Sequence, residues 1–226
     1  MDEQKKLLNY FKKWDGAGAV GVGLLALGAL FLWLSTSYPI PFPITLALLI
    51  IGLPMFLYGN IGRGNETMAN DYVKKNCQKI SFPELESDRA LHKRTLTEPE
   101  EFEFGGYEMR RGLYFKKKKD ASLISSEYTY AKVIVLKDAF YLKKMTFSLV
   151  SDEKTQQTFD IPFDSIHDIT VERETFFVGT GEKNQFRAKT CFLAITYGEG
   201  EKLLLPTPDN AYVEEFADKM KRTYSA

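Results

Sequence analysis

The sequence predicts a membrane α-hairpin followed by a mainly-β domain, an antiparallel barrel of about seven strands with a C-terminal capping helix. Three observations lead to this fold class: a long uncharged stretch near the N-terminus, alternation of apolar and polar residues beyond residue 101, and an amphipathic segment at the end. We expect four segments: an amphipathic N-terminal helix (1–15), a two-helix transmembrane hairpin (16–62), a helical connector (63–100) and the β domain (101–226).

The uncharged stretch runs from Gly16 to Gly62 and contains no Asp, Glu, Lys, Arg or His, although the rest of the chain is densely charged. A bilayer core of roughly 30 Å needs about 20 helical residues, so this stretch is long enough for two spans. The prolines of Ser37–Pro43 break the helix between them. The predicted spans are therefore Ala17–Thr36 and Ile44–Tyr58. A buried soluble hairpin would show a polar face, and this stretch has none.

Basic residues flank the predicted hairpin and are absent from its connecting turn. They are Lys5, Lys6, Lys12 and Lys13 on the N-terminal side and Arg63, Lys74, Lys75 and Lys79 on the other. The positive-inside rule then predicts a multi-pass protein of the cell membrane with both termini in the cytoplasm. Cys77 and Cys191 would lie in a reducing compartment, where no structural disulfide is expected.

The first fifteen residues have an amphipathic pattern. Leu7, Leu8, Phe11 and Trp14 fall on one helical face, and the lysines lie towards the other. Such a segment can lie in the membrane interface with its apolar face in lipid. It can equally be a plain helical extension of the first span, and the sequence leaves both possibilities open.

Small residues recur at helical spacing in the first span. Ala17 with Gly21, and Ala19 with Gly23, form two small-xxx-small pairs. Such pairs let two helices approach closely in a membrane. The partner helix is either the second span or the first span of another copy, which would make a homo-oligomer.

The β domain is predicted from short alternating segments separated by polar turns. The strand candidates are Phe102–Phe104, Ser126–Leu136, Ala139–Lys143, Thr146–Ser151, Thr158–Pro162, Ile169–Arg173, Phe186–Thr196 and Lys202–Pro206. Thr207 is the predicted N-cap of a final helix with Pro208 at its first position. The apolar face of that helix comprises Tyr212, Val213, Phe216, Ala217 and Met220, and we expect it to plug one end of the barrel.

Three segments follow one another in the second half of the chain: Tyr130–Leu142, Phe159–Ile169, and Leu203–Pro208 with the final helix. In this order they resemble the central hairpin, the step into the second sheet, and the closing strand with its capping helix in the pleckstrin-homology (PH) superfold, in its bacterial PH-like or GRAM-like form. The resemblance covers about half of the chain. It implies a binding or scaffolding domain without catalysis, an inference by analogy of fold.

Nothing in the sequence indicates an enzyme, a metal or a cofactor. The chain has two histidines, His92 and His167, and neither has a metal-ligand spacing. Residues Gly16–Gly21 match the G-x-G-x-x-G pattern, but an apolar helix follows and no acidic residue lies between Gly21 and Glu66. The balance of 30 basic and 30 acidic residues argues against a nucleic-acid polymer as partner.

The best candidate ligand contacts are basic. They are Arg110, Arg111, Lys116, Lys117, Lys118 and Lys119, which could meet anionic lipid or a phosphorylated ligand. The alternative is structural: a hairpin could set these lysines opposite the acidic residues just upstream, namely Glu98, Glu100, Glu101 and Glu103.

Three functions follow from the sequence. The first is a membrane-anchored binding module that presents its β domain to a protein or to anionic lipid. The second is a two-span membrane effector that oligomerises on binding a cyclic nucleotide. The third is an accessory subunit whose spans pack into a larger membrane complex. The first is preferred, and no motif diagnostic of the second is present.

Overall fold

The computed structural model describes residues 3–13, 16–36, 38, 41–98, 100–118, 122–179, 185–209 and 211–224. The chain forms two compact units, Met1–Ala69 and Asn70–Ala226. The first unit contains the apolar helices and the second unit is mainly β, and each is described in turn.

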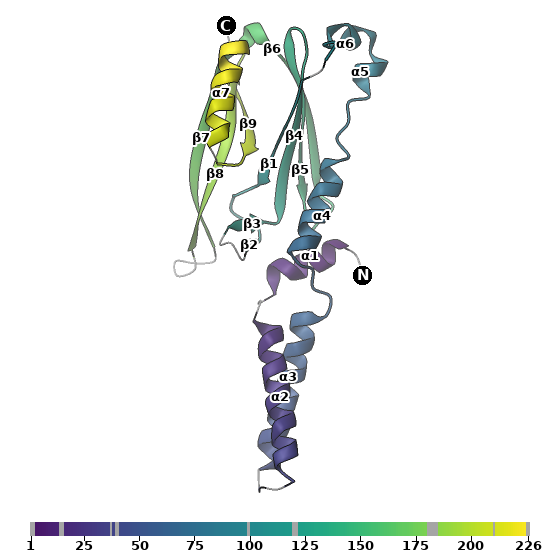
Figure 1. The fold of residues 1–226 in the computed structure, drawn as a ribbon, viewed down its shortest axis with the longest axis vertical. Coiled ribbons are helices and arrows are strands. Elements are labelled where there is room, and N and C mark those ends of the chain that lie inside the picture. The colour runs from purple at the N-terminus through teal and green to yellow at the C-terminus, as the bar shows by residue number, and fades with distance from the viewer. Residues whose placement is uncertain are drawn as a thin grey trace. The chain divides into compact units, whose positions relative to one another are not determined.

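Two apolar helices dominate the first unit: α2 (Ala17–Leu34) and α3 (Phe42–Asn60) run side by side (Figure 1). Their mean hydropathies are 2.1 and 2.0, so both are long and apolar enough to cross a membrane. The prediction of two apolar helices is confirmed. Three residues of the predicted turn, Ser37, Pro39 and Ile40, lie outside the described residues.

Glycines bring the two helices together. A Cβ atom on Gly21 would lie 2.3 Å from the backbone nitrogen of Phe56, and one on Gly59 would lie 2.2 Å from that of Gly18. Large apolar side chains point the other way, and Trp33 is 70 % exposed. The hairpin thus has small residues inside and large apolar residues outside, the reverse of a soluble helix pair.

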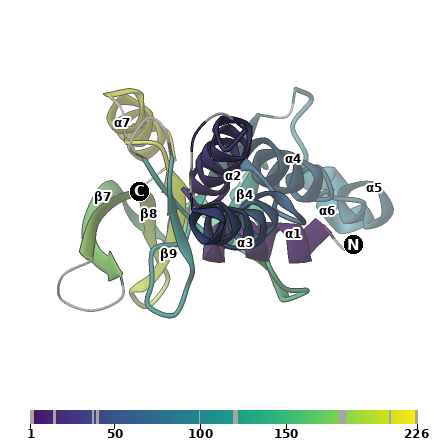
Figure 2. The same ribbon diagram turned by 90° about the horizontal axis from the view of Figure 1, so that it is seen from below.

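Helix α1 (Glu3–Lys12) lies across one end of this hairpin, as Figures 1 and 2 show from two directions. The Asn9 side chain donates a hydrogen bond of 2.8 Å to the carbonyl of Gly62, and the amide of Gly64 donates one of 2.8 Å to the carbonyl of Lys6. Because α1 is a separate helix with its own direction, the structure excludes one of the two possibilities that the sequence left open, the plain helical extension of the first span. Trp14 lies outside the described residues.

Nine strands form the sheets of the second unit, counted over the described residues. They are β1 (Glu101–Tyr107), β2 (Phe115–Lys117), β3 (Leu123–Ser125), β4 (Glu127–Val135), β5 (Ala139–Ser148), β6 (Lys154–Pro162), β7 (Ile166–Gly179), β8 (Gln185–Tyr197) and β9 (Glu201–Thr207). A short 3-10 helix, η1 (Phe163–Ser165), joins β6 to β7.

All strand pairs are antiparallel, in sheets of order β1-β4-β5-β6, β2-β3 and β7-β8-β9. The predicted mainly-β domain is confirmed, but the sheets do not close into one barrel. The expected strands Ala139–Lys143 and Thr146–Ser151 are a single strand, β5, since its pairing with β4 continues through Lys144 and Met145.

The core lies between the two larger sheets and helix α7 (Ala211–Tyr224), where Phe216, Ala217 and Met220 are buried. The predicted C-terminal helix is confirmed, but its predicted cap is wrong. Thr207 still pairs with Cys191 as the last residue of β9, so the helix begins only at Ala211.

The connector contains α4 (Glu66–Cys77), α5 (Glu84–Ser87) and α6 (Arg89–Arg94). From Asn70 onward it belongs to the second unit. It packs on the face of the four-stranded sheet opposite the core, where the Phe82 ring lies 5.8 Å from that of Tyr141. Arg94 anchors its end with ion pairs of 2.8 Å to Asp138 and 2.7 Å to Asp160.

Candidate functional site

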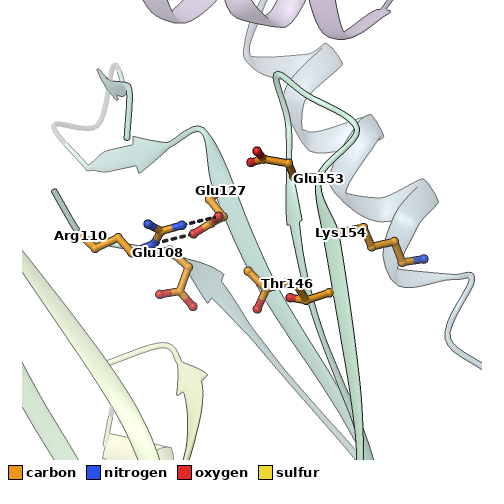
Figure 3. Close-up of a pocket in the computed structure, with 7 residues that line it drawn as sticks. Glu108, Arg110, Glu127, Thr146, Glu153 and Lys154 are labelled. Carbon is orange, nitrogen blue, oxygen red and sulfur yellow. Dashed lines mark hydrogen bonds and ion pairs between the residues drawn. The ribbon is translucent and has the colours of Figure 1, made fainter. Parts of the chain in front are cut away.

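A charged cleft lies at one end of the four-stranded sheet (Figure 3). The inner side chains of β4 change from apolar to polar along the strand, from Val133 and Ala131 to Thr129 and Glu127. Alternate residues of a strand share one face, so the polar end opens a cleft beyond the apolar core. Its volume is about 570 Å³ and its lining residues are Glu108, Arg110, Glu127, Thr146, Glu153, Lys154 and Thr155.

Arg110 is the central cation of the cleft and is already paired. Its Nε and Nη2 donate hydrogen bonds of 2.9 and 2.8 Å to the two carboxylate oxygens of Glu127. The Glu127 side chain is 11 % exposed, and that of Arg110 is 61 % exposed. The hydrogen bonds to Glu127, with further attraction from Glu108 and Glu153, raise the pKa of Arg110.

The remaining cleft residues make it acidic. Glu108 accepts a hydrogen bond of 2.5 Å from the Thr129 hydroxyl, which lies 2.7 Å from that of Thr146. In Figure 3 the Glu153 carboxylate points towards the Arg110–Glu127 pair, and the Lys154 side chain points away from it. The lining residues carry three carboxylates against two cations, Arg110 and Lys154, so the cleft has a net negative charge that opposes the entry of an anion.

A lysine lies between the cleft and the core. The Lys144 ammonium donates a hydrogen bond of 3.0 Å to the carbonyl of Leu204, which links β5 to β9. Burial lowers the pKa of Lys144, against an opposing attraction from Glu108. This side chain helps to hold the two larger sheets together.

The described members of the predicted basic set do not form one exposed surface. Lys116 and Lys117 lie on β2, where Lys116 is buried and Lys117 is exposed, because successive residues of a strand face opposite sides. Arg111 is exposed and Lys118 is half-buried. Lys119 lies outside the described residues.

The predicted pairing of these lysines with upstream glutamates is wrong. Strand β2 pairs with β3, where Lys117 lies opposite Leu123. Strand β1 pairs with β4 instead, and Glu101 makes an ion pair of 2.5 Å with Lys132. The chain leaves β1 at Tyr107 and forms a separate hairpin before β4, so the acidic and basic segments belong to different sheets.

The two small-residue pairs of α2 lie on different faces. Ala17 and Gly21 are buried against α3. Ala19 is exposed, and no heavy atom lies within 4 Å of a Cβ built on Gly23. The first pair therefore serves the hairpin itself and the second faces outward.

A groove runs between β1, the end of β9 and the first half of α7. Its volume is about 330 Å³ and it is lined by Glu101, Phe102, Glu103, Phe104, Thr207, Pro208, Tyr212, Val213 and Phe216. The sequence pattern identified the aromatic face of each element. It did not predict the groove, because no local signal shows that β1 and α7 lie together.

The histidines and cysteines do not form a reactive cluster within the part of the chain that the structure describes. No group of three or more His, Cys, Asp or Glu residues there could hold a metal ion. His92 and His167 are exposed and each makes a hydrogen bond with a backbone carbonyl. Burial, with a smaller contribution from Glu103, raises the pKa of Cys77 to about 11, which opposes thiolate formation at neutral pH.

No family model, curated protein or solved structure matches the chain.

Proposed function

We propose that this chain is a membrane-anchored, non-enzymatic binding module whose β domain recognises a protein partner from the cytoplasmic side. The observation that carries the proposal is the construction of the α2–α3 hairpin. Glycines such as Gly21 and Gly59 face inward, and side chains such as Trp33, Phe42 and Ile50 face outward with no polar face beside them. In water this surface would be an aggregation site, and in lipid it is the expected exterior.

The charge distribution supports an orientation with both termini in the cytoplasm. The hydrogen bonds between α1 and Gly62–Gly64 bring the basic residues of α1 to the same end of the hairpin as Arg63. The opposite end, between Leu34 and Phe42, carries no charged residue. Positive flanks on one side favour retention of that side in the cytoplasm.

We further propose that the β domain has a PH-like fold. The order of its elements supports this assignment: a four-stranded antiparallel sheet, then a three-stranded antiparallel sheet, then helix α7 against the core. The β2–β3 hairpin would be an insertion between the first and second strands of that fold.

A protein partner is preferred to anionic lipid or a cyclic nucleotide because the charged cleft repels anions. Arg110 is held by Glu127, and Glu108 and Glu153 add negative charge. A second candidate function, an accessory subunit of a membrane complex, is favoured by one feature only, the outward-facing pair Ala19 and Gly23.

The anchor is tested with cysteine variants in intact cells, after Cys77 and Cys191 are replaced by Ser. A membrane-impermeant maleimide should label Tyr38→Cys from outside, whereas it should label Ser87→Cys only after the cells are permeabilised. The protein should also stay in the membrane pellet at pH 11. Release into the supernatant, or the opposite labelling pattern, would contradict the proposed anchor and its orientation.

The choice of partner is tested with the full chain in phosphatidylcholine nanodiscs. Association with vesicles that contain phosphatidylglycerol or phosphoinositides should be no stronger than with neutral vesicles. Salt-sensitive association that Arg111→Ser and Lys117→Ser abolish would replace the protein partner with a lipid surface.

A further inference from the structure

The groove beside β1 has an aromatic floor and an exposed aromatic rim. The Phe216 ring of α7 lies 4.9 Å from that of Phe102 and 5.8 Å from that of Phe104. Tyr212, 6.2 Å from Phe216, is 69 % exposed. This is a large apolar side chain left in solvent next to a cavity of about 330 Å³, a volume that accommodates one or two side chains.

The groove lies along a strand edge. One edge of β1 hydrogen-bonds to β4, and among the described strands none pairs with its other edge. At Gly106 residue Pro206 of β9 packs against β1, since a Cβ there would lie 3.0 Å from the Cβ of Pro206. The Glu101–Phe104 half lines the groove instead. An unpaired strand edge beside a pocket is the arrangement that binds an extended peptide.

The charge of the groove is of one sign. Its charged lining residues are Glu101 and Glu103, which alternate along β1 with the two phenylalanines of the floor. One lysine faces both carboxylates: Lys132 lies opposite Glu103 in the β1–β4 pairing and makes its ion pair with Glu101. Glu103 also accepts a hydrogen bond from the Tyr130 hydroxyl, so the two glutamates outnumber their cation. The edge therefore attracts a cationic segment and repels an acidic one.

We propose that this groove binds an extended peptide segment of a partner protein, with an apolar anchor side chain on the aromatic floor and adjacent Lys or Arg residues beside Glu101 and Glu103. The inference rests on the proposed function and names the surface and the chemistry of the partner. The anchor would insert between Phe102 and Tyr212, and the backbone of the peptide would extend along the free edge of β1.

The test uses the full chain in phosphatidylcholine nanodiscs, which do not attract basic peptides. The probes are fluorescein-labelled decapeptides with a central Leu-Phe pair, flanked by Lys/Arg, by Gly/Ser or by Glu/Asp, and binding is read by fluorescence anisotropy. The basic-flanked probe should bind at least tenfold more tightly than the acidic-flanked probe, and this preference should weaken with added salt.

Two variants locate the binding. Tyr212→Ala removes the aromatic rim and Pro208→Trp fills the groove. Each substitution should weaken the binding of the basic-flanked probe at least tenfold. Both residues are exposed, so the variants should retain the thermal transition of the parent protein. Phe177→Ala, at another exposed aromatic residue on β7, is the matched control and should bind as the parent does. Glu103→Gln should reduce the preference for basic flanks, and Glu174→Gln should not.

Each contrary result has a distinct meaning. Binding that survives both groove variants would overturn the groove assignment and leave the binding-module function standing. Equal binding of all flank classes would overturn the proposed chemistry of the partner. Absence of binding by every probe would overturn the peptide site, while the cysteine-labelling experiment would still decide the membrane anchor independently.

Discussion

At the scale of single residues, the most instructive side chain is Arg110. The sequence suggested a residue free to bind an anion, but in the structure Arg110 already donates two hydrogen bonds to the carboxylate of Glu127. A nearly buried carboxylate needs a partner, because its desolvation is costly when it remains unpaired. Arg110 therefore stabilises the β domain by pairing with Glu127 and is not free to bind a ligand.

Replacement of Arg110 by Met should lower the free energy of unfolding, because Glu127 loses its charge-assisted hydrogen bonds. The decrease should be only about 1 kcal/mol, since the arginine side chain is largely exposed and solvent screens the pair. The measurement is a urea titration of the full chain in detergent. Arg111→Met is the matched control and should leave the midpoint unchanged. Equal effects of the two substitutions would contradict the structural role of the pair.

At the scale of elements, the α2–α3 hairpin depends on where its glycines point. Gly21 and Gly59 meet the backbone of the opposite helix, so any side chain there would push the helices apart. Gly23 has open space around it. The same residue type thus has two roles, one within the hairpin and one on its outer surface.

Gly21→Leu should lower the temperature at which the full chain unfolds in detergent, since the leucine would overlap Phe56. Gly23→Leu should leave this temperature unchanged. If the outer face binds the helix of another copy, Gly23→Leu should also reduce the oligomeric mass measured by light scattering. A loss of stability from Gly23→Leu as large as that from Gly21→Leu would contradict the assigned faces.

The connector is held on the sheet by a small polar cluster. The Lys143 ammonium lies 2.6 Å from the Glu84 carboxylate and donates a hydrogen bond of 2.7 Å to the carbonyl of Ser81. The Tyr141 hydroxyl donates to Glu84 at 3.1 Å. Burial, the largest single influence, would raise the pKa of Glu84, but the hydrogen bonds from Lys143, Tyr141 and the backbone together lower it.

A carboxylate with a lowered pKa stabilises the folded state above the pKa of an unperturbed glutamate, about 4.3, and this contribution is lost as the pH falls through the lower pKa of the folded state. Glu84→Gln should therefore reduce stability at pH 7 by up to about 1 kcal/mol. It should also show a smaller loss of stability than the parent between pH 5 and pH 3. Glu86→Gln, at an exposed neighbour, is the control, and identical pH profiles of parent and Glu84→Gln would contradict the cluster's role.

At the scale of the whole molecule, the chain consists of two compact units with different surfaces. The first unit exposes apolar side chains, and the second has a conventional buried core with a charged surface. The boundary falls within α4, so part of the predicted connector belongs to the β unit. The Tyr72 ring, for example, lies 6.3 Å from Phe147.

A fragment of residues 70–226 should accordingly be soluble and show one cooperative thermal transition. A fragment of residues 98–226 should aggregate, because it lacks the connector and exposes Ile134, Tyr141 and Phe147, and each large apolar side chain is worth about 1.5–3 kcal/mol of burial. Size-exclusion chromatography and circular dichroism would distinguish the two. Equal solubility and stability of both fragments would show that the connector is dispensable.

The features that the sequence determined are those that depend on near neighbours. An uninterrupted apolar stretch predicts two long helices, and alternation of polar and apolar residues predicts strands, because helix and strand periods repeat within a few residues. The two apolar helices, the mainly-β domain and the final helix were all predictable in this way. The predicted number of strands and the predicted end of the last strand were less accurate, because turns and caps depend on weaker sequence signals.

Tertiary structure alone decided which distant residues meet. Glu127 reaches Arg110, and Phe216 of α7 meets Phe102 of β1, only through the pairing of strands and the packing of a helix from the far end of the chain. Likewise, only the rotation of α2 against α3 decided that Gly21 faces inward and Gly23 outward. These choices depend on register and packing between segments far apart in sequence, so no local pattern encodes the cleft or the groove.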